Sequence, residues 1–363
     1  MRTHTRRRFL SVSASAVAAS AVPWATRSDV GVAADNATET KKSSPKSRPQ
    51  VYAIGKIPRV DIHTHIKIDE LQQTAGFVEA MDAAGISVSV NLSCTREMLE
   101  QADAIRKKWK GRILLCPGDF DTSDGLWWSE EELAIFRDNR CAGTKIWTQY
   151  RQGVLAPEFV KKVQRQGQLG LPVIGFHVAD PPEGKFLKPN YRECIREAAK
   201  LIERCPETTF IMAHGFWLMI QDRGLDVLSG YFDRYPNLNA DLSAVYQWWD
   251  PPQPTHKKLR DFIIAYKDRL LFGTDGHPGY TTPERLKRIY QILETSEDHL
   301  KGFFRNETNL RGLSLPVDVL TNIYYSNAAR LVPEVRRSLV QCGYKLSLEP
   351  ATKPVRNAKM AAV

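Results

Sequence analysis

Residues 60–65, which read Val-Asp-Ile-His-Thr-His, decide the fold class of this chain. The segment is short and rich in β-branched residues, which is typical of a strand. Because side chains alternate between the two faces of a strand, His63 and His65 point the same way. Burial of polar groups without partners costs free energy, so packing alone does not justify them. The segment therefore predicts a strand that presents two histidines to a shared ligand.

Seven further apolar runs follow this strand at regular intervals, with amphipathic stretches such as 157–168, 191–204 and 283–294 between them. Eight strands that alternate with helices predict parallel βαβ units, which fit either a closed barrel or an open doubly wound sheet. The absence of a G-x-G-x-x-G turn after the first strand weakens the dinucleotide-binding sheet. We expect an α/β fold of the (β/α)8 TIM-barrel type. The predicted strands are 60–65, 86–92, 112–118, 143–148, 172–178, 208–214, 238–243 and 270–275.

The chain is expected to hold one barrel domain at 57–345 between two disordered segments, a linker at 35–56 and a tail at 346–363. Residues 1–34 have a charged start and a short Ala/Ser-rich apolar stretch, as signal peptides do. The run Arg6-Arg7-Arg8-Phe9-Leu10 resembles a twin-arginine signal, although a general secretory signal or an amphipathic tail also fits. We expect export by the twin-arginine machinery to the periplasm or the extracellular space.

The net charge of +10 is concentrated at the start of the chain. Residues 1–50 hold nine Lys/Arg and three Asp/Glu, so the remaining chain carries 42 basic and 38 acidic residues. That balance argues against a nucleic-acid partner. No apolar run of roughly 18 residues occurs, so we expect no membrane span. The six cysteines form no C-x-x-C pair and are expected to be buried or partly buried free thiols.

Polar residues gather at the carboxyl ends of four predicted strands. They are His63 and His65 on the first, His177 on the fifth, His214 on the sixth and Asp275 on the eighth. Strand ends of this kind converge on one face of a barrel. Singly, a histidine is often a hydrogen-bonded core residue and Asp275 could cap a helix. Together, imidazoles and a carboxylate suit zinc, iron, manganese or a similar divalent metal.

In this order, these residues resemble the amidohydrolase superfamily. The resemblance is narrower to the amidohydrolase-related (amidohydrolase 2) family, which includes aminocarboxymuconate-semialdehyde decarboxylase and the resorcylate decarboxylases. It covers about residues 57–335, and 315–332 resembles the family's closing helix. The matching motifs are Asp61-Ile62-His63-Thr64-His65, Ile174-Gly175-Phe176-His177, Ile211-Met212-Ala213-His214-Gly215 and Gly273-Thr274-Asp275.

The resemblance implies that one divalent metal, with zinc expected, binds to His63, His65, His177 and Asp275. It implies that His214 either joins the metal or acts on the substrate. Lys145 ends the fourth strand, where binuclear members of the superfamily carry a carboxylated lysine that bridges two metals. Lys145 could instead face the substrate or pair with a carboxylate, so the expected count is one ion, or two if Lys145 is carboxylated.

The expected mechanism is hydrolysis by water whose pKa the metal lowers towards ~7. Asp275 would accept the water proton and pass it to the leaving group. His214 would polarise the substrate carbonyl or stabilise the oxyanion. Asp61 would anchor a ligand imidazole or a nearby backbone group.

The substrate is expected to be a small amide, ester or lactone that contains a ring and a carboxylate. Trp147 and Trp217 lie in or beside loops that follow strands and could stack on a ring, or could simply pack against the barrel. Arg151 could clamp a carboxylate, or could be solvated. A non-oxidative decarboxylase is an alternative that would use the same metal, and an inactive exported binding protein is a second. The sequence leaves a homo-oligomer open.

Overall fold

The computed structural model describes residues 56–67, 71–118, 128–147, 153–178, 189–249, 254–277, 281–300 and 310–346. The expected signal segment at 1–34, all but the last residue of the expected linker, and residues 347–363 of the expected tail lie outside these residues. Of the helices found in the described part, none is long and apolar enough to cross a membrane.

The eight predicted strands are all present, and every pairing between them is parallel. They are ordered β1-β2-β3 in one sheet and β4-β5-β6-β7-β8 in a second. The strands are β1 (Arg59–Thr64), β2 (Ile86–Cys94), β3 (Ile113–Pro117), β4 (Thr144–Trp147), β5 (Val173–His177), β6 (Phe210–Met212), β7 (Leu238–Asp241) and β8 (Leu270–Leu271).

Two seams join these sheets into a closed barrel. At the first seam, the Ala142 amide donates to the Leu115 carbonyl over 2.8 Å, which links the start of β4 to β3. At the second, the Ile62 amide in β1 donates to the Phe272 carbonyl just after β8 over 3.1 Å. The last strand therefore lies beside the first. The described residues form the expected TIM barrel.

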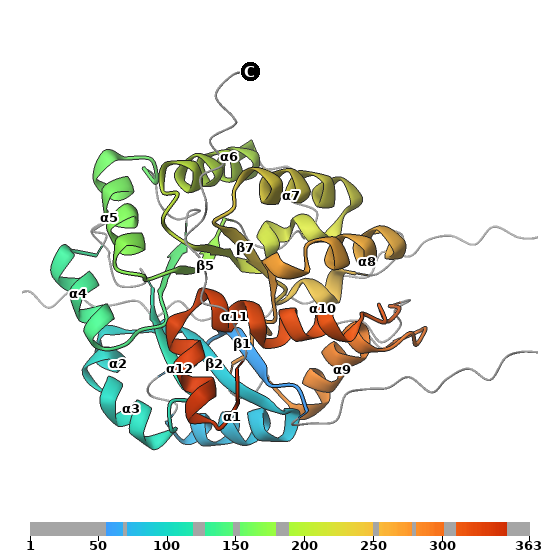
Figure 1. Ribbon diagram of the computed structural model, residues 1–363, viewed down its shortest axis with the longest axis horizontal. Coiled ribbons are helices and arrows are strands. Elements are labelled where there is room, and N and C mark those ends of the chain that lie inside the picture. The colour runs from blue at the N-terminus through green and yellow to red at the C-terminus, as the bar shows by residue number, and fades with distance from the viewer. Residues whose placement is uncertain are drawn as a thin grey trace, which may run out of the picture. The chain divides into compact units, whose positions relative to one another are not determined.

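Helices follow the strands and surround the barrel (Figure 1). The predicted helices 157–168 and 283–294 have the expected bounds, and the third begins two residues earlier, at Pro189. The α-helices are α1 (Leu71–Ala84), α2 (Arg96–Glu100), α3 (Ala102–Lys108), α4 (Glu130–Asp138), α5 (Pro157–Gln168), α6 (Pro189–Arg204), α7 (Asp222–Arg234), α8 (His256–Ala265), α9 (Pro283–Glu294), α10 (Val317–Thr321), α11 (Asn327–Leu331) and α12 (Pro333–Gln341). Shorter turns are the 3-10 segments η3 (Ala213–Ile220), η4 (Val245–Trp248) and η5 (Lys267–Arg269) and the π-helical η6 (Asn322–Ser326).

The apolar core has two layers. A large cluster lies between the strands and the surrounding helices, and a smaller cluster draws on one face of the strands together with α11 and α12. The smaller cluster includes Val60 and Ile62 of β1 and Val335 and Leu339 of α12. The Ser338 hydroxyl donates to the Gly111 carbonyl just before β3, so α12 closes the amino-terminal end of the barrel. The carboxyl ends are left for the candidate site.

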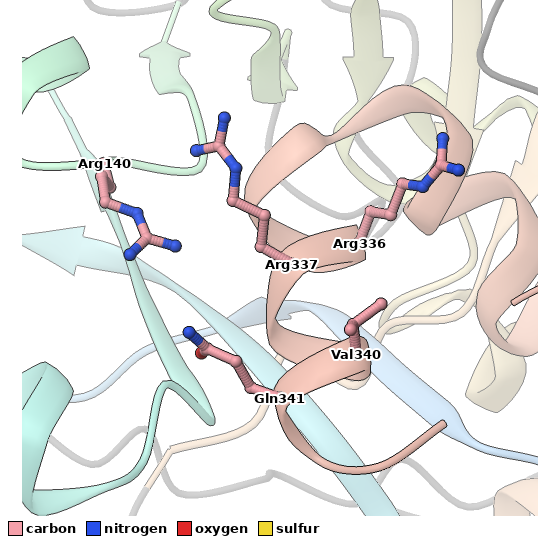
Figure 2. Close-up of a pocket in the computed structure, with 5 residues that line it drawn as sticks. All are labelled: Arg140, Arg336, Arg337, Val340 and Gln341. Carbon is pink, nitrogen blue, oxygen red and sulfur yellow. The ribbon is translucent and has the colours of Figure 1, made fainter. Parts of the chain in front are cut away.

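A shallow pocket of about 360 Å³ lies at this closed end, between α12 and the turn before β4 (Figure 2). The Glu334 carboxylate holds two of its arginines, Arg140 through Nε at 3.1 Å and Arg337 through Nη1. This pairing offsets much of the pocket's positive charge. The pocket is lined by Arg140, Arg336, Arg337, Val340 and Gln341.

The six cysteines are free thiols, as expected. Cys342 is exposed, however, so the prediction that all six are at least partly buried is wrong for this residue. It follows the last turn of α12, beyond the residues that face the core.

Candidate metal centre

Three predicted ligand atoms meet where the chain closes the barrel. β1 delivers His63 and His65, and the Asp275 amide donates to the His63 carbonyl over 2.9 Å. Asp275 has a left-handed backbone, with φ of 56°. Its Oδ1 lies 3.3 Å from His63 Nε2 and 3.2 Å from His65 Nε2. One carboxylate oxygen thus faces the same nitrogen of both imidazoles.

Hydrogen bonds to the other ring nitrogens orient both imidazoles. His63 Nδ1 lies 2.9 Å from Asp241 Oδ2, and His65 Nδ1 lies 2.6 Å from Ser93 Oγ. Because a carboxylate oxygen only accepts, His63 carries its hydrogen on Nδ1 and a lone pair on Nε2. Among the described residues this buried Nε2 has no hydrogen-bond partner.

These distances fit a small divalent cation. Ligand atoms that bind a tetrahedral ion at ~2.0–2.1 Å lie ~3.3 Å apart, which is the observed spacing of the two nitrogens from the Asp275 oxygen. Within the described part of the chain no hydrogen bond uses the lone pair on His63 Nε2, so this lone pair is available to a cation.

Two further predicted histidines lie beside this group. His177 ends β5, and its ring centre is 5.2 Å from that of His214. The His214 ring stacks on His63 at 4.8 Å and lies 4.5 Å from the ring of Trp217. The structure therefore brings all five predicted residues, together with Trp217, into one cluster.

The sequence predicts that His214 ends the sixth strand, and this prediction is wrong. β6 ends at Met212, and His214 lies in a left-handed turn just after it. Residues 214–217 have φ between 51° and 60°, and only Gly215 among them is a glycine. Left-handed backbone costs roughly 1–2 kcal/mol for each non-glycine residue, so this turn is strained. Two contacts hold it: the His214 amide donates to Asp241 Oδ1 over 3.0 Å, and the Tyr191 hydroxyl donates to the Phe216 carbonyl.

The His214 ring has a defined tautomer. Its Nδ1 lies 2.9 Å from the Ser243 carbonyl oxygen, which can only accept, so Nδ1 carries the hydrogen. In the neutral ring the lone pair is then on Nε2. A neutral His214 in this tautomer can accept a proton or bind a cation, but it cannot donate to an oxyanion until it is protonated.

The site keeps three of its imidazoles neutral and the Asp275 carboxylate charged. Burial lowers the pKa of His65 to about 4, with help from the Lys145 charge, and burial also lowers the pKa of His177 and His214. Although burial opposes ionisation of Asp275, the hydrogen bond from His65 and the nearby imidazoles hold its pKa well below the ordinary value. Neutral imidazoles beside an ionised carboxylate are the form in which these groups bind metals.

Lys145 and Asp61 are both fully buried. Lys145, on β4, lowers the pKa of both His65 and His177 through its charge. Asp61 accepts from the Thr274 amide at 3.0 Å and the Thr274 hydroxyl at 2.6 Å. It also accepts from the His63 amide at 3.2 Å. Burial raises the pKa of Asp61 to about 7 against these hydrogen bonds. Asp61 thus anchors nearby backbone, one of its two expected roles.

Sequence reasoning missed three polar side chains that contact the ligand rings: Asp241, Ser243 and Ser93. A signal for two of them was present, because Asp241 and Ser243 alternate at the carboxyl end of the seventh predicted strand, as His63 and His65 do on the first. Two predicted substrate residues remain untested. Arg151 lies outside the described residues, and only the backbone of Trp147, which pairs with His177, is described.

The sequence profile of a family described as amidohydrolase matches residues 60–333. The chain belongs to the amidohydrolase family. It is therefore a metal-dependent hydrolase of the amidohydrolase superfamily, whose members use a divalent metal. Among the described residues of this amidohydrolase, two groups bring three possible ligand atoms within 4.8 Å of one another: His63, His65 and Asp275, and His63, His214 and Asp241.

The amidohydrolase is similar to solved structures at low sequence identity. An uncharacterized TIM-barrel protein of Bordetella bronchiseptica is 15% identical with a TM-score of 0.49, over 79% of this chain and 100% of that one. An amidohydrolase of Burkholderia multivorans is 11% identical with a TM-score of 0.46, over 75% and 98%. The IDCase of Metarhizium anisopliae is 14% identical with a TM-score of 0.44, over 78% and 99%. No curated protein matches the chain.

Proposed function

We propose that this amidohydrolase binds one divalent cation, zinc, through His63, His65, His177 and Asp275. We propose that it uses water to cleave a C–O or C–N bond. The observation that carries the proposal is the shared Asp275 oxygen, which faces the Nε2 atoms of His63 and His65 at 3.3 and 3.2 Å.

The second group of ligand atoms, with Asp241, is not the cation site. Both Asp241 oxygens already accept hydrogen bonds, Oδ2 from His63 Nδ1 and Oδ1 from the His214 amide. A cation there would displace the hydrogen that His63 holds on Nδ1. Asp275 offers the opposite side of the His63 ring, where the nitrogen carries a lone pair.

When bound, the cation supplies Lewis acidity that lowers the pKa of a water molecule towards ~7. Asp275 can take the proton of that water, because its carboxylate is ionised and its side chain is about one-third exposed (35%). It then returns the proton to the leaving group. The neutral His214 can take up a proton from solvent at Nε2, and the charged ring would then donate a hydrogen bond to the oxygen on which negative charge develops.

The proposed substrate is a small amide, ester or lactone with a ring and a carboxylate. Trp217 supports the proposal of a ring in the substrate, because the centre of its own ring lies 4.5 Å from that of the His214 ring. The proposal also includes Trp147, which would stack on the ring, and Arg151, which would bind the carboxylate of the substrate. It includes carboxylation of Lys145, which would add a second ion. The arginine pair before Phe9 and Leu10 supports export by the twin-arginine machinery.

The test begins with the natively purified full chain. Mass spectrometry of bound metals should find one zinc per chain, or two if Lys145 is carboxylated. Lactones, amides and esters of ring carboxylic acids should then be screened for hydrolysis. Asp275→Asn should retain some zinc and lose turnover by at least 100-fold, an effect in the range expected for general acid–base catalysis. The matched control is Asp261→Asn on α8, whose carboxylate is half exposed and pairs with Lys257 at the surface. It should behave as wild type.

Three outcomes would overturn the proposal. Wild-type turnover in Asp275→Asn would remove its assigned role. Release of carbon dioxide without water addition would make the protein a decarboxylase. Native protein without a tightly bound metal would favour the exported binding protein.

A further inference from the structure

Asp241 is buried at the end of β7, and both of its carboxylate oxygens are committed. Oδ1 accepts from two backbone amides, those of His214 and Ser243, each over 3.0 Å. It also accepts from the Ser243 hydroxyl at 2.5 Å. Oδ2 lies 2.9 Å from His63 Nδ1. One side chain therefore contacts a predicted metal ligand and the backbone of a predicted catalytic histidine.

We propose that Asp241 is a positioning residue that makes His63 a metal ligand by fixing its tautomer and holds His214 in place through the left-handed turn. The proposal deepens the function proposed above and rests on its ligand set. An acceptor at His63 Nδ1 places the hydrogen there and leaves the lone pair on Nε2, towards Asp275. Without that acceptor, both tautomers of the ring become accessible.

The hydrogen bonds to Asp241 Oδ1 determine how an asparagine at this position must be oriented. Backbone amides only donate, so the oxygen that faces His214 and Ser243 cannot be exchanged for an NH₂ group. In Asp241→Asn the amide oxygen must therefore occupy the Oδ1 position, and the NH₂ group must face His63 Nδ1. A donor at that point moves the ring hydrogen to Nε2 and removes the lone pair that would bind the cation.

Asp241→Asn is the test, because it keeps the size of the side chain and inverts one hydrogen bond. In metal-free protein labelled with ¹⁵N-histidine, NMR should show His63 with hydrogen on Nδ1 in the wild type and on Nε2 in the variant. The Kd for Zn²⁺, from competition with a chelator, should rise about 10- to 100-fold, as for loss of other groups that orient metal ligands.

Ser243→Ala is the matched control. It removes the hydroxyl that lies 3.0 Å from His63 Nδ1 and that donates to Asp241 Oδ1, but it keeps the Asp241 carboxylate, the two backbone amides that donate to it and the Ser243 carbonyl. The His63 tautomer should stay as in the wild type, and the Kd should change less than in Asp241→Asn. An equal effect of both variants on the Kd would overturn the proposal.

Two further results would also overturn it. One is a wild-type His63 with its hydrogen on Nε2, which the NMR spectrum shows even if the variant does not fold. The other is a folded Asp241→Asn chain that keeps the wild-type tautomer and Kd. If the wild type binds no zinc, the proposed function fails, but the tautomer measurement on metal-free protein still tests Asp241 separately.

Discussion

Gly175, in the middle of β5, leaves room for the buried Lys145 side chain of β4. Its φ is +72°, and an added Cβ would lie 2.7 Å from Leu92 Cδ1 and 3.3 Å from Lys145 Cγ. Gly175→Ala should therefore lower the free energy of unfolding by about 2–4 kcal/mol, through backbone strain and overpacking. Urea denaturation of the two proteins measures the change.

Gly230→Ala is the control for this prediction. Gly230 lies in α7, and an added Cβ would meet no atom within 4 Å. Alanine favours a helix over glycine by up to about 1 kcal/mol, so this variant should be slightly more stable than wild type. Equal stability changes in the two variants would contradict the role given to Gly175.

Single residues show how far the sequence could predict the site. His63, His65 and Asp275 were predictable because polar groups at strand ends converge in any barrel. Asp241 stands at such an end too, but its role depends on which ring nitrogen it reaches. That geometry follows from the twist and closure of the barrel, which the residue pattern does not contain.

At the scale of elements, the strained turn at 214–217 depends on side chains from its neighbours. Tyr191→Phe removes the hydroxyl of α6 that donates to the Phe216 carbonyl. The free energy of unfolding should fall by about 1 kcal/mol, the net value of one hydrogen bond. Turnover should fall as His214 shifts, while bound zinc stays unchanged. Thermal unfolding, turnover and metal content are the three measurements.

The control is Tyr231→Phe on α7. Tyr231 is only partly buried, and within the described part of the chain no hydrogen bond joins its hydroxyl to the turn at 214–217. It should leave turnover at the wild-type value. If Tyr191→Phe lost zinc and stability together, the hydroxyl would support the whole site rather than this turn.

A buried ion pair and a hydrogen bond to it link β1, α9 and η6. Arg59 Nη2 of β1 lies 3.1 Å from Glu294 Oε1 at the end of α9. The Tyr324 hydroxyl of η6 donates to the same oxygen over 2.7 Å. Glu294→Gln would leave the Arg59 charge buried without its counterion and should lower the free energy of unfolding by about 3–5 kcal/mol.

Glu203→Gln is the comparison for this ion pair. Glu203 pairs with Arg234 over 2.9 Å, but both side chains are more than half exposed. Surface pairs of this kind contribute at most about 1 kcal/mol. Chemical denaturation should therefore separate the two variants clearly, and a loss below about 1 kcal/mol for Glu294→Gln would contradict the assigned role.

The helices that lie on the surface of the barrel were the most predictable elements. Pro157 and Pro283 each begin a helix, and apolar residues at helical spacing continue it, so local sequence defines α5 and α9. The left-handed turn and the π-helical η6 have no such local signal. Both make tertiary contacts instead: Asp241 and Tyr191 hold the turn, and Arg59 and Glu294 contact Tyr324 of η6.

At the scale of the whole molecule, the metal-free protein should lose stability in acid. His65, His177 and His214 have lowered pKa values, so below pH ~6.5 the unfolded chain binds protons that the folded chain does not. Asp61 offsets the effect of one histidine, because its raised pKa means that the folded chain binds a proton there that the unfolded chain does not. A difference of one to two protons gives a fall of roughly 1.4–3 kcal/mol per pH unit between pH ~6 and ~5.

The measurement is denaturant unfolding of the chelator-treated chain across this range. His177→Gln removes one of the three histidines and should reduce the slope by about 1.4 kcal/mol per pH unit. A chain that gains stability between pH 6.5 and 5 would show that the imidazoles are not held neutral.

The seam between β8 and β1 has a consequence for biosynthesis. The His63 carbonyl and the Asp275 amide form one of its hydrogen bonds, and the same two residues supply ligand atoms of the proposed centre. A nascent polypeptide that has reached only the seventh strand has the histidines but not the carboxylate. With the proposed ligands, the ribosome must therefore synthesise Asp275 before all four can bind the cation. Binding of the cation by the full ligand set is then a late event, which requires the last strand of the barrel.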